Sequence, residues 1–260
     1  MDHVVVVYAS DGGWGSEAGS SLGEHRLPDG TMSAIIHTSE LSRRFGRRWA
    51  YARVTLSIEP GERVLLFGAN GSGKTTLLRT LATLLRPSRG DLRLFGADPR
   101  ASLLDVRRRL GFFSHNVGLY EDLSARDNLA VLARLTGRPR DRDILAAALA
   151  DVGLEDRPDP IRRYSAGMRR RVGLAALLSK KPELTLLDEP FSALDPAGMA
   201  QVSDIIRTLP GTVVVTSHQV ERAAALCQRA ILLKDGQIRW QGPAEQAWAA
   251  WRASQREAGS

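Results

Sequence analysis

Short apolar runs alternate with stretches of helical periodicity along most of this 260-residue chain. Runs of apolar and β-branched residues predict strands at 34–38, 53–58, 64–67, 184–187, 212–216 and 230–233. A turn at 87–90 separates a helix after residue 77 from a further element at 91–95. Apolar residues spaced i, i+3, i+4 predict helices at 125–135, 144–152 and 169–178. This order predicts an α/β fold, a mostly parallel sheet interrupted by helices.

The two ends of the chain differ from this pattern. Residues 1–31 are rich in glycine and serine and lack periodicity, so we expect a flexible extension. Met32 precedes the first convincing strand, and our hypothesis is that translation starts there; an intact mass that includes residue 1 would reject it. Residues 244–260 predict a C-terminal helix and tail. We expect Trp248 and Trp251 to pack on their own domain; an interface role is the alternative.

Composition describes an ordinary globular protein, with 43% hydrophobic and 25% charged residues. No apolar run approaches the roughly 18 residues that a membrane helix needs. The patch at 4–9 follows Asp2 and lacks a basic region, which argues against a signal peptide. The single cysteine, Cys227, fits a reducing cytosol.

The net charge of +7 allows an anionic partner. The excess is mostly arginine, scattered except for the triplets at 107–109 and 169–171. A solvated helix face, or a GC-rich genome, explains these triplets more simply than a DNA-binding stripe. Nucleic-acid binding is therefore not expected.

A glycine-rich stretch lies between the predicted strand at 64–67 and the helix that follows, the context of a phosphate-binding P-loop. Glycines let backbone N–H groups point at an anion, and the helix N-terminus adds partial positive charge. Lys74 can reach the terminal phosphates, and the Thr75 hydroxyl can ligate Mg²⁺. A chance match in such a chain has a probability on the order of one per cent. The predicted nucleotide-binding residues are Gly68, Ala69, Asn70, Gly71, Ser72, Gly73, Lys74, Thr75 and Thr76.

An acidic pair ends the predicted strand at 184–187. The C-terminal ends of buried parallel strands form the edge where α/β sheets bind ligands. Asp188 is therefore predicted to serve the Mg²⁺ shell, and Glu189 to polarise the attacking water. The alternative is a pair that merely caps the strand before Pro190.

A third motif, residues 164–168, directly precedes a predicted arginine-rich helix. Small residues at a helix N-terminus can form an anion site, and the alternative is a plain helix N-cap. Four features follow one another along the chain: the P-loop, this motif, the acidic strand end and the later His218. This is the order found in ATP-binding cassette (ABC) ATPases, and residues 34 to about 243 resemble that family. The resemblance implies a P-loop NTPase core with a mixed sheet over 32–243, an N-terminal antiparallel β subdomain, and a helical subdomain inserted at about 117–180.

The resemblance also assigns roles to residues outside the P-loop. His218 resembles the switch histidine at the γ-phosphate. Phe45 resembles the aromatic that stacks on adenine; a core aromatic is the alternative. Residues 164–168 resemble the family's signature motif, which acts in trans on nucleotide held by a partner. They are Tyr164, Ser165, Ala166, Gly167 and Met168, and positions 164, 166 and 168 depart from the usual residues. A further segment resembles the family's D-loop, which links the two nucleotide sites of a dimer: Ser192, Ala193, Leu194 and Asp195.

The Q-loop departs most from the family. His115 stands where glutamine is expected, and Asn116 supplies the amide if the register shifts by one. Histidine can donate or coordinate, but its charge varies near neutral pH. A histidine here also resembles the ATPase subunit of the heme exporter of cytochrome c biogenesis.

The resemblance implies an ATPase that binds ATP and Mg²⁺ and pairs with a second nucleotide-binding domain, expected to be an identical chain. It implies a separate transmembrane permease as partner and a place at the cytoplasmic face of the membrane. The patch at 117–135 is a candidate docking surface, or the core face of the helical insertion. Alternatives are a drug or other exporter ATPase and a weakly hydrolytic soluble regulator. A DNA-maintenance ATPase would need a long coiled-coil insertion, and a translation-associated protein two cassettes; we find neither feature.

Overall fold

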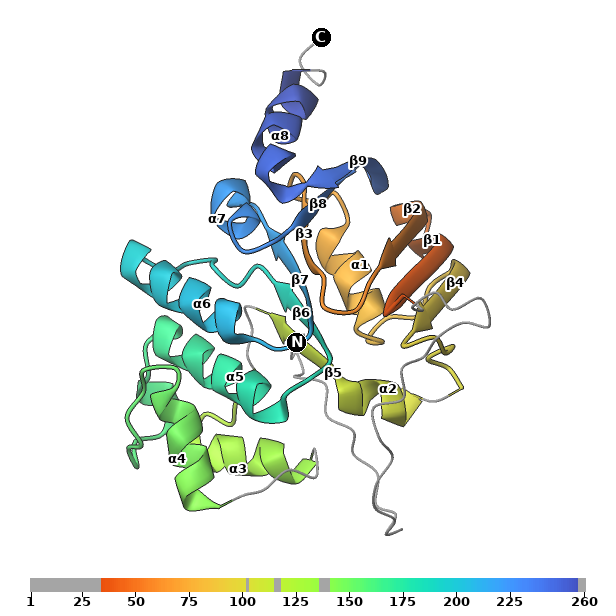
Figure 1. The fold of residues 1–260 in the computed structure, drawn as a ribbon. Helices are drawn as coiled ribbons and strands as arrows, with labels where there is room; N and C mark the ends of the chain where they lie inside the picture. The colour runs from red at the N-terminus through yellow and green to blue at the C-terminus, as the bar shows by residue number, and fades with distance from the viewer. Residues whose placement is uncertain (1–33, 102, 115–117, 136–140, 257–260) are drawn as a thin grey trace.

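The computed structural model describes residues 34–101, 103–114, 118–135 and 141–256. A six-stranded sheet crosses its centre in the order β5 (Leu110–Ser114), β6 (Leu184–Asp188), β7 (Thr212–Ser217), β3 (Arg63–Phe67), β8 (Arg229–Lys234) and β9 (Gln237–Pro243) (Figure 1). The first five strands are parallel, and β9 is antiparallel to β8. This confirms the predicted, mostly parallel sheet.

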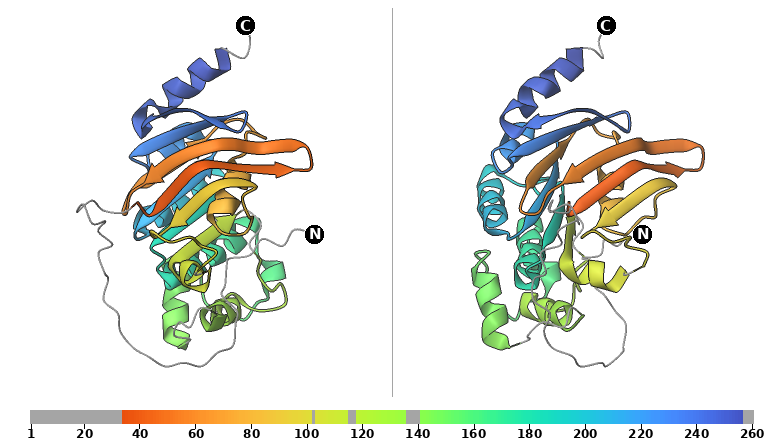
Figure 2. Two further views of the ribbon diagram at one scale, coloured as in Figure 1. Left: turned by 90° about the vertical axis from the view of Figure 1, so that its right-hand side faces the viewer. Right: turned by 45° about the vertical axis from the view of Figure 1, so that its right-hand side comes forward.

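A second sheet is antiparallel and comes mainly from the N-terminal part of the described chain. It has the order β2 (Arg48–Ile58), β1 (Ile36–Phe45) and β4 (Arg89–Leu94). Ile36 lies opposite both Ile58 and Leu94 and is fully buried. The α1 helix (Lys74–Leu81) joins the two sheets, because its leucines share one core with residues of both. Figure 2 shows the smaller sheet lying across the edge of the molecule beside α1.

Helices cover the other face of the large sheet. They are α5 (Ala166–Lys180), α6 (Pro196–Thr208) and α7 (Val220–Ala224), with α3 (Ala125–Leu135) and α4 (Arg142–Ala150) packed beyond α5. The short α2 (Leu103–Arg109) leads into β5, and a 3₁₀ turn (Ile161–Arg163) precedes α5. Leu129 and Leu132 of α3 are buried in the core shared with α4 and α5. The apolar side of α3 thus packs into the core of these helices, but Leu129 and Leu132 also line a cavity of about 310 Å³, so the docking surface stays a prediction. None of the described helices is long and apolar enough to cross a bilayer.

The chain ends in α8 (Ala247–Arg256), after a 3₁₀ turn (Ala244–Gln246). Trp251 packs edge-on against Phe67, with ring centroids 6.5 Å apart, so this tryptophan packs on its own domain as predicted. Trp248 is 41% exposed and lines a surface hollow together with residues of α6 and α7, so it packs only partly on its own domain.

Candidate nucleotide-binding site

The P-loop joins the last residue of β3, Phe67, to the first residue of α1, Lys74. Gly68 has φ 150° and Gly73 has φ 103°, a backbone region that side chains rarely adopt. A Cβ on Gly73 would lie 2.3 Å from the Ala50 carbonyl oxygen, and one on Gly68 2.1 Å from that of Leu233. Only glycine fits this cradle, and the first turn of α1 leaves its N–H groups without helical partners. The turn therefore suits a phosphate chain.

Lys74 folds back over the P-loop. Its Nζ donates to the carbonyl oxygens of Gly68, at 2.8 Å, and Ala69, at 3.0 Å. Burial lowers the pKa of this ammonium, while the carboxylates of Glu189 and Asp188 oppose that shift. Phosphate oxygens can replace the two carbonyls as acceptors, so the side chain is placed for the role predicted from the sequence.

Asp188 ends β6 inside the protein and is only 1% exposed. Its Oδ1 accepts hydrogen bonds from the Thr75 hydroxyl at 3.0 Å and the Thr216 hydroxyl at 2.8 Å. A carboxylate beside a hydroxyl supplies the hard oxygen ligands that Mg²⁺ prefers. The donor set therefore fits Mg²⁺, which Thr75 and Asp188 would hold.

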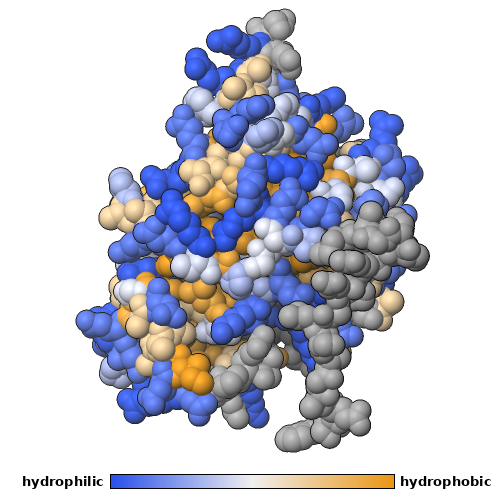
Figure 3. Space-filling view, viewed as in Figure 1, coloured by the Kyte–Doolittle hydropathy of each residue, from blue (hydrophilic) through white to orange (hydrophobic). Residues whose placement is uncertain are grey.

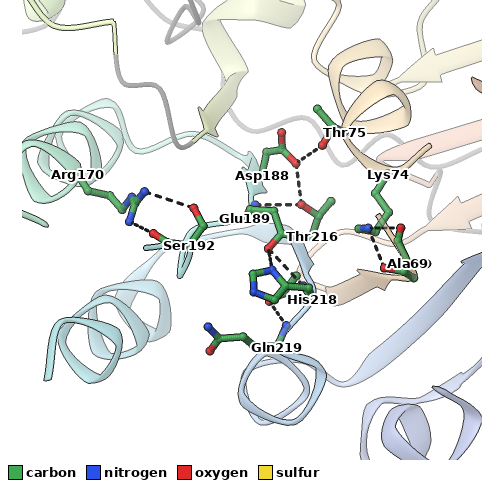
Figure 4. A network of polar contacts seen from close by, with 12 residues as sticks. Ala69, Lys74, Thr75, Arg170, Asp188, Glu189, Ser192, Thr216, His218 and Gln219 are labelled. Carbon is green, nitrogen blue, oxygen red and sulfur yellow. Dashed lines mark hydrogen bonds and ion pairs between the residues drawn. The ribbon is translucent and has the colours of Figure 1, made fainter. Parts of the chain in front are cut away.

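Glu189 has a positive φ of 50°, a strained value for a residue with a side chain. Its N–H donates to the Thr216 carbonyl and hydroxyl oxygens, at 3.1 and 3.0 Å, which holds this conformation. Its Oε2 accepts from the His218 N–H at 3.2 Å and lies 2.8 Å from His218 Nδ1. Figure 4 shows the two side chains meeting beside Thr216. The turn after β6 thus directs Glu189 to His218, two residues that the sequence places apart.

A cavity of about 410 Å³ opens over the P-loop. Phe45, 51% exposed, lines it together with Lys74, Thr75 and Glu189. The exposed ring at this cavity rules out a core aromatic. The Arg43 guanidinium lies over the ring, 4.7 Å from its centroid, so stacking on a base would use the opposite face. Arg48 and Trp49 also line the cavity, and the sequence analysis missed them. Arg48 pairs with Phe45 across the β1–β2 turn, so hairpin register could have indicated Arg48.

The motif at 164–168, which the resemblance implies acts in trans, lies at the start of α5. Ser165 is its N-cap, with Oγ accepting from the Met168 N–H at 3.1 Å, and Ala166 is the first helical residue. Asp195 caps α6 in the same way, accepting from the Gly198 N–H at 2.9 Å. These two caps, with Gly167, Met168 and Leu194, line a second cavity of about 270 Å³. It shares no lining residue with the P-loop cavity. Tyr164 is 3% exposed, so its ring faces the protein core and not a partner.

The Q-loop candidates His115 and Asn116 lie outside the described residues, as does the N-terminal extension with Met32. The strand that leads to them, β5, is buried and pairs with β6, so Ser114 lies opposite Asp188. The sequence positions before 115 therefore reach the edge of the sheet that carries the acidic pair.

Fold and site together define a P-loop NTPase. The model of the ABC transporter family matches residues 51–192, more than half of the chain. The chain belongs to this family, whose ATP-binding members are ATPases.

Curated relatives differ in what their names say they transport. The chain is 37% identical over 214 residues to the daunorubicin resistance ATP-binding protein DrrA3 of Streptomyces coeruleorubidus, covering 78% of this chain and 66% of that protein. It is 42% identical over 178 residues to the cytochrome c biogenesis ATP-binding export protein CcmA of Pseudomonas aeruginosa, covering 67% of this chain and 88% of that protein. It is 37% identical over 239 residues to the phosphonates import ATP-binding protein PhnC 2 of Pseudomonas savastanoi pv. phaseolicola, covering 82% and 86%.

Solved structures match the fold as well. One is a dimeric ATP-binding cassette in a post-hydrolysis state bound to ADP and Pi, with a TM-score of 0.72 and 26% identity. The match covers 81% of this chain and 99% of that one. The ADP and Pi of that structure support nucleotide as the ligand of this fold.

Proposed function

We propose that this protein is the ATP-hydrolysing subunit of a membrane transporter and works as a head-to-tail pair of identical chains. The observation that carries the pairing is the separation of the two cavities, which have no lining residue in common. A nucleotide on Lys74 meets Ser165 and Gly167 only if these come from a second chain. The ATPase would act at the cytoplasmic face of the membrane, on a separate permease.

In this proposal, Phe45 stacks on the base while the P-loop N–H groups and Lys74 hold the phosphates. Mg²⁺, held by Thr75 and Asp188, would neutralise phosphate charge. Glu189 accepts a hydrogen bond from the attacking water and aligns it with the γ-phosphate. His218, in contact with Glu189, donates to the γ-phosphate and so stabilises charge as the bond to the leaving group breaks. Ser165 and Gly167 of the second chain complete the enclosure and exclude bulk water other than the attacking molecule.

For the transported substrate, we propose heme export for cytochrome c biogenesis. The support is 42% identity across 88% of CcmA, together with His115 where the family usually has glutamine. Export of a drug-like molecule is the rival, because the match to DrrA3 covers more of this chain.

The experiment is affinity purification of the tagged full-length chain from detergent-solubilised membranes, with identification of every co-purifying protein. A control tagged at the same end carries Lys74→Ala, which should retain the permease because docking does not need nucleotide. Recovery of cytochrome c biogenesis membrane proteins supports heme export. A different permease overturns the substrate and keeps the transporter, whereas absence of any membrane protein contradicts the transporter itself.

A further inference from the structure

Three successive arginines follow the N-terminus of α5, and each donates to a backbone carbonyl. Arg169 donates to Tyr164, at 3.0 Å, and Arg171 donates to Gly153, at 2.8 Å. Arg170 donates to the carbonyl oxygen of Ser192. The expectation that this triplet forms a solvated helix face is therefore wrong, because these contacts tie α5 to three parts of the chain.

Arg170 is the buried member of the triplet, with 5% of its surface exposed. Burial lowers the pKa of its guanidinium. Within the described part of the chain no carboxylate pairs with it, and its Nε has no hydrogen-bond partner. A buried cation without a counter-ion is costly, and an apolar side chain of the same length would fill the space more cheaply. Space-filling alone therefore does not account for an arginine here.

The acceptor of Arg170 lies at a particular place in the loop after β6. Ser192 is three residues after Glu189 and three before Asp195, and its N–H donates to the Glu189 carbonyl oxygen at 3.2 Å. Its Oγ lies 3.4 Å from Arg170 Nη2. Figure 4 shows Arg170 reaching from α5 to Ser192, on the side of the loop opposite His218. One side chain thus joins the helix of the trans-acting motif to the turn that carries Glu189.

Arg170 also lies close to the N-terminal end of α5. Arg170 lies three residues after Gly167, so about one helical turn separates it from the cavity lined by Ser165 and Gly167. A displacement of this helix end moves the guanidinium, and through Ser192 it moves the Glu189 turn. The two terminal nitrogens of the buried guanidinium face the carbonyl and hydroxyl oxygens of the same residue, Ser192, which suits the planar fork of arginine.

We propose that Arg170 is a positioning residue that couples engagement of the α5 N-terminus by a partner's nucleotide to the alignment of Glu189. This inference rests on the proposed function, because it requires a second chain whose nucleotide contacts Ser165 and Gly167. Arg170 lines neither cavity; it acts through Ser192.

The test compares the full-length wild type with Arg170→Met, which removes all donors, and Arg170→Lys, which keeps the charge on a single donor nitrogen. The matched control is Arg63→Met, because Arg63 also donates to backbone carbonyls, those of Ile206 and Leu209, but at the start of β3. Each variant is assayed for kcat and KM for ATP, Kd for ATP, melting temperature, and ATP-driven dimerisation in a Glu189→Gln background.

For Arg170→Met we expect kcat and dimer affinity each to fall about tenfold, with Kd for ATP within about twofold of wild type. Arg170→Lys should recover part of kcat. Arg63→Met should lower the melting temperature and leave kcat of the folded protein unchanged.

Two results overturn the inference while the proposed function stands. One is wild-type kcat and dimerisation in folded Arg170→Met, and the other is a loss of kcat that only follows a fall in melting temperature, as in the control. If wild type itself hydrolyses ATP without any ATP-driven dimer, the proposed pairing fails, and the inference fails with it.

Discussion

The two cavities of this protein are built in different ways. Around the P-loop cavity, Lys74, Asp188 and Glu189 are each held by contacts within the chain. Around the second cavity, Ser165 and Asp195 cap helices, and the surface between them is formed by Gly167, Met168 and Leu194. The first cavity gathers charged side chains, whereas the second is lined by the N-termini of two helices, which favour an anion. Under the proposed pairing, each nucleotide takes its charged contacts from the first cavity of one chain and its helix N-termini from the second cavity of the other.

The largest effect should come from the P-loop cavity. Glu189→Gln keeps the shape and the hydrogen bond to the His218 N–H but cannot accept a proton. We expect kcat to fall by about 10² to 10⁴ with Kd for ATP unchanged, measured by steady-state hydrolysis and equilibrium binding. Turnover like wild type would remove Glu189 from the mechanism. Low wild-type activity that this change leaves unaltered would favour the weakly hydrolytic regulator.

A change in the second cavity should lower turnover without changing the affinity of the isolated chain for ATP. Ser165→Ala removes the side-chain cap of α5 and one contact to the partner's nucleotide, so we expect kcat to fall about tenfold and stability by about 1 kcal/mol. Kd for ATP of the isolated chain should not change, because Ser165 does not line the P-loop cavity. Ser165→Thr is the matched control, because it keeps a hydroxyl N-cap at the same position. A weakened Kd in Ser165→Ala would show that both cavities serve one nucleotide.

Within the P-loop cavity, base and phosphate contributions can be separated. Phe45→Ala should weaken ATP binding about tenfold, because it removes one stacking surface, and leave tripolyphosphate binding unchanged. Phe45→Tyr keeps the ring and should bind ATP like wild type. Equal losses for ATP and tripolyphosphate in the alanine variant would argue against stacking. Isothermal titration measures both ligands.

The smallest effect concerns a group away from both cavities. Burial raises the pKa of the Cys227 thiol from 9.0 to about 12. The folded state therefore disfavours the thiolate, so this contribution to stability is complete below pH 9 and is lost as the pH rises toward 12. Urea unfolding between pH 8 and 11 should show falling stability, with a shallower slope in Cys227→Ala. Buried Tyr51, whose pKa is also raised to about 12, would supply part of the remaining slope. An unchanged slope would show that the native thiol ionises normally.

Elements with strong periodicity could be predicted from the sequence. The buried strands β3, β6, β7 and β8 are short apolar runs, and the fold class followed from their order. The helix α6 was missed, although Asp195 before Pro196 is an N-cap pattern and Val202, Ile205 and Ile206 have helical spacing. The strand β9 was missed because it is an edge strand with no buried position, which weakens the alternation.

Side-chain environments were harder to predict. An arginine triplet looks solvated in sequence, and only packing shows that Arg170 is buried against Ser192. Figure 3 shows the same difficulty at the surface, where hydrophilic residues lie among exposed apolar ones over the helices. Trp248 and Trp251 also differ in burial despite similar surroundings in sequence. Such outcomes depend on neighbours that are distant along the chain.

One complementation experiment tests the central claim most directly. Lys74→Ala lacks a working P-loop, and Ser165→Arg lacks a working α5 N-terminus, so each homodimer should be inactive. A mixed dimer pairs the intact P-loop of one chain with the intact motif of the other, so an equimolar mixture should regain about a quarter of wild-type activity. Activity of Ser165→Arg alone, or mixed dimers that form without any recovery, would contradict head-to-tail pairing.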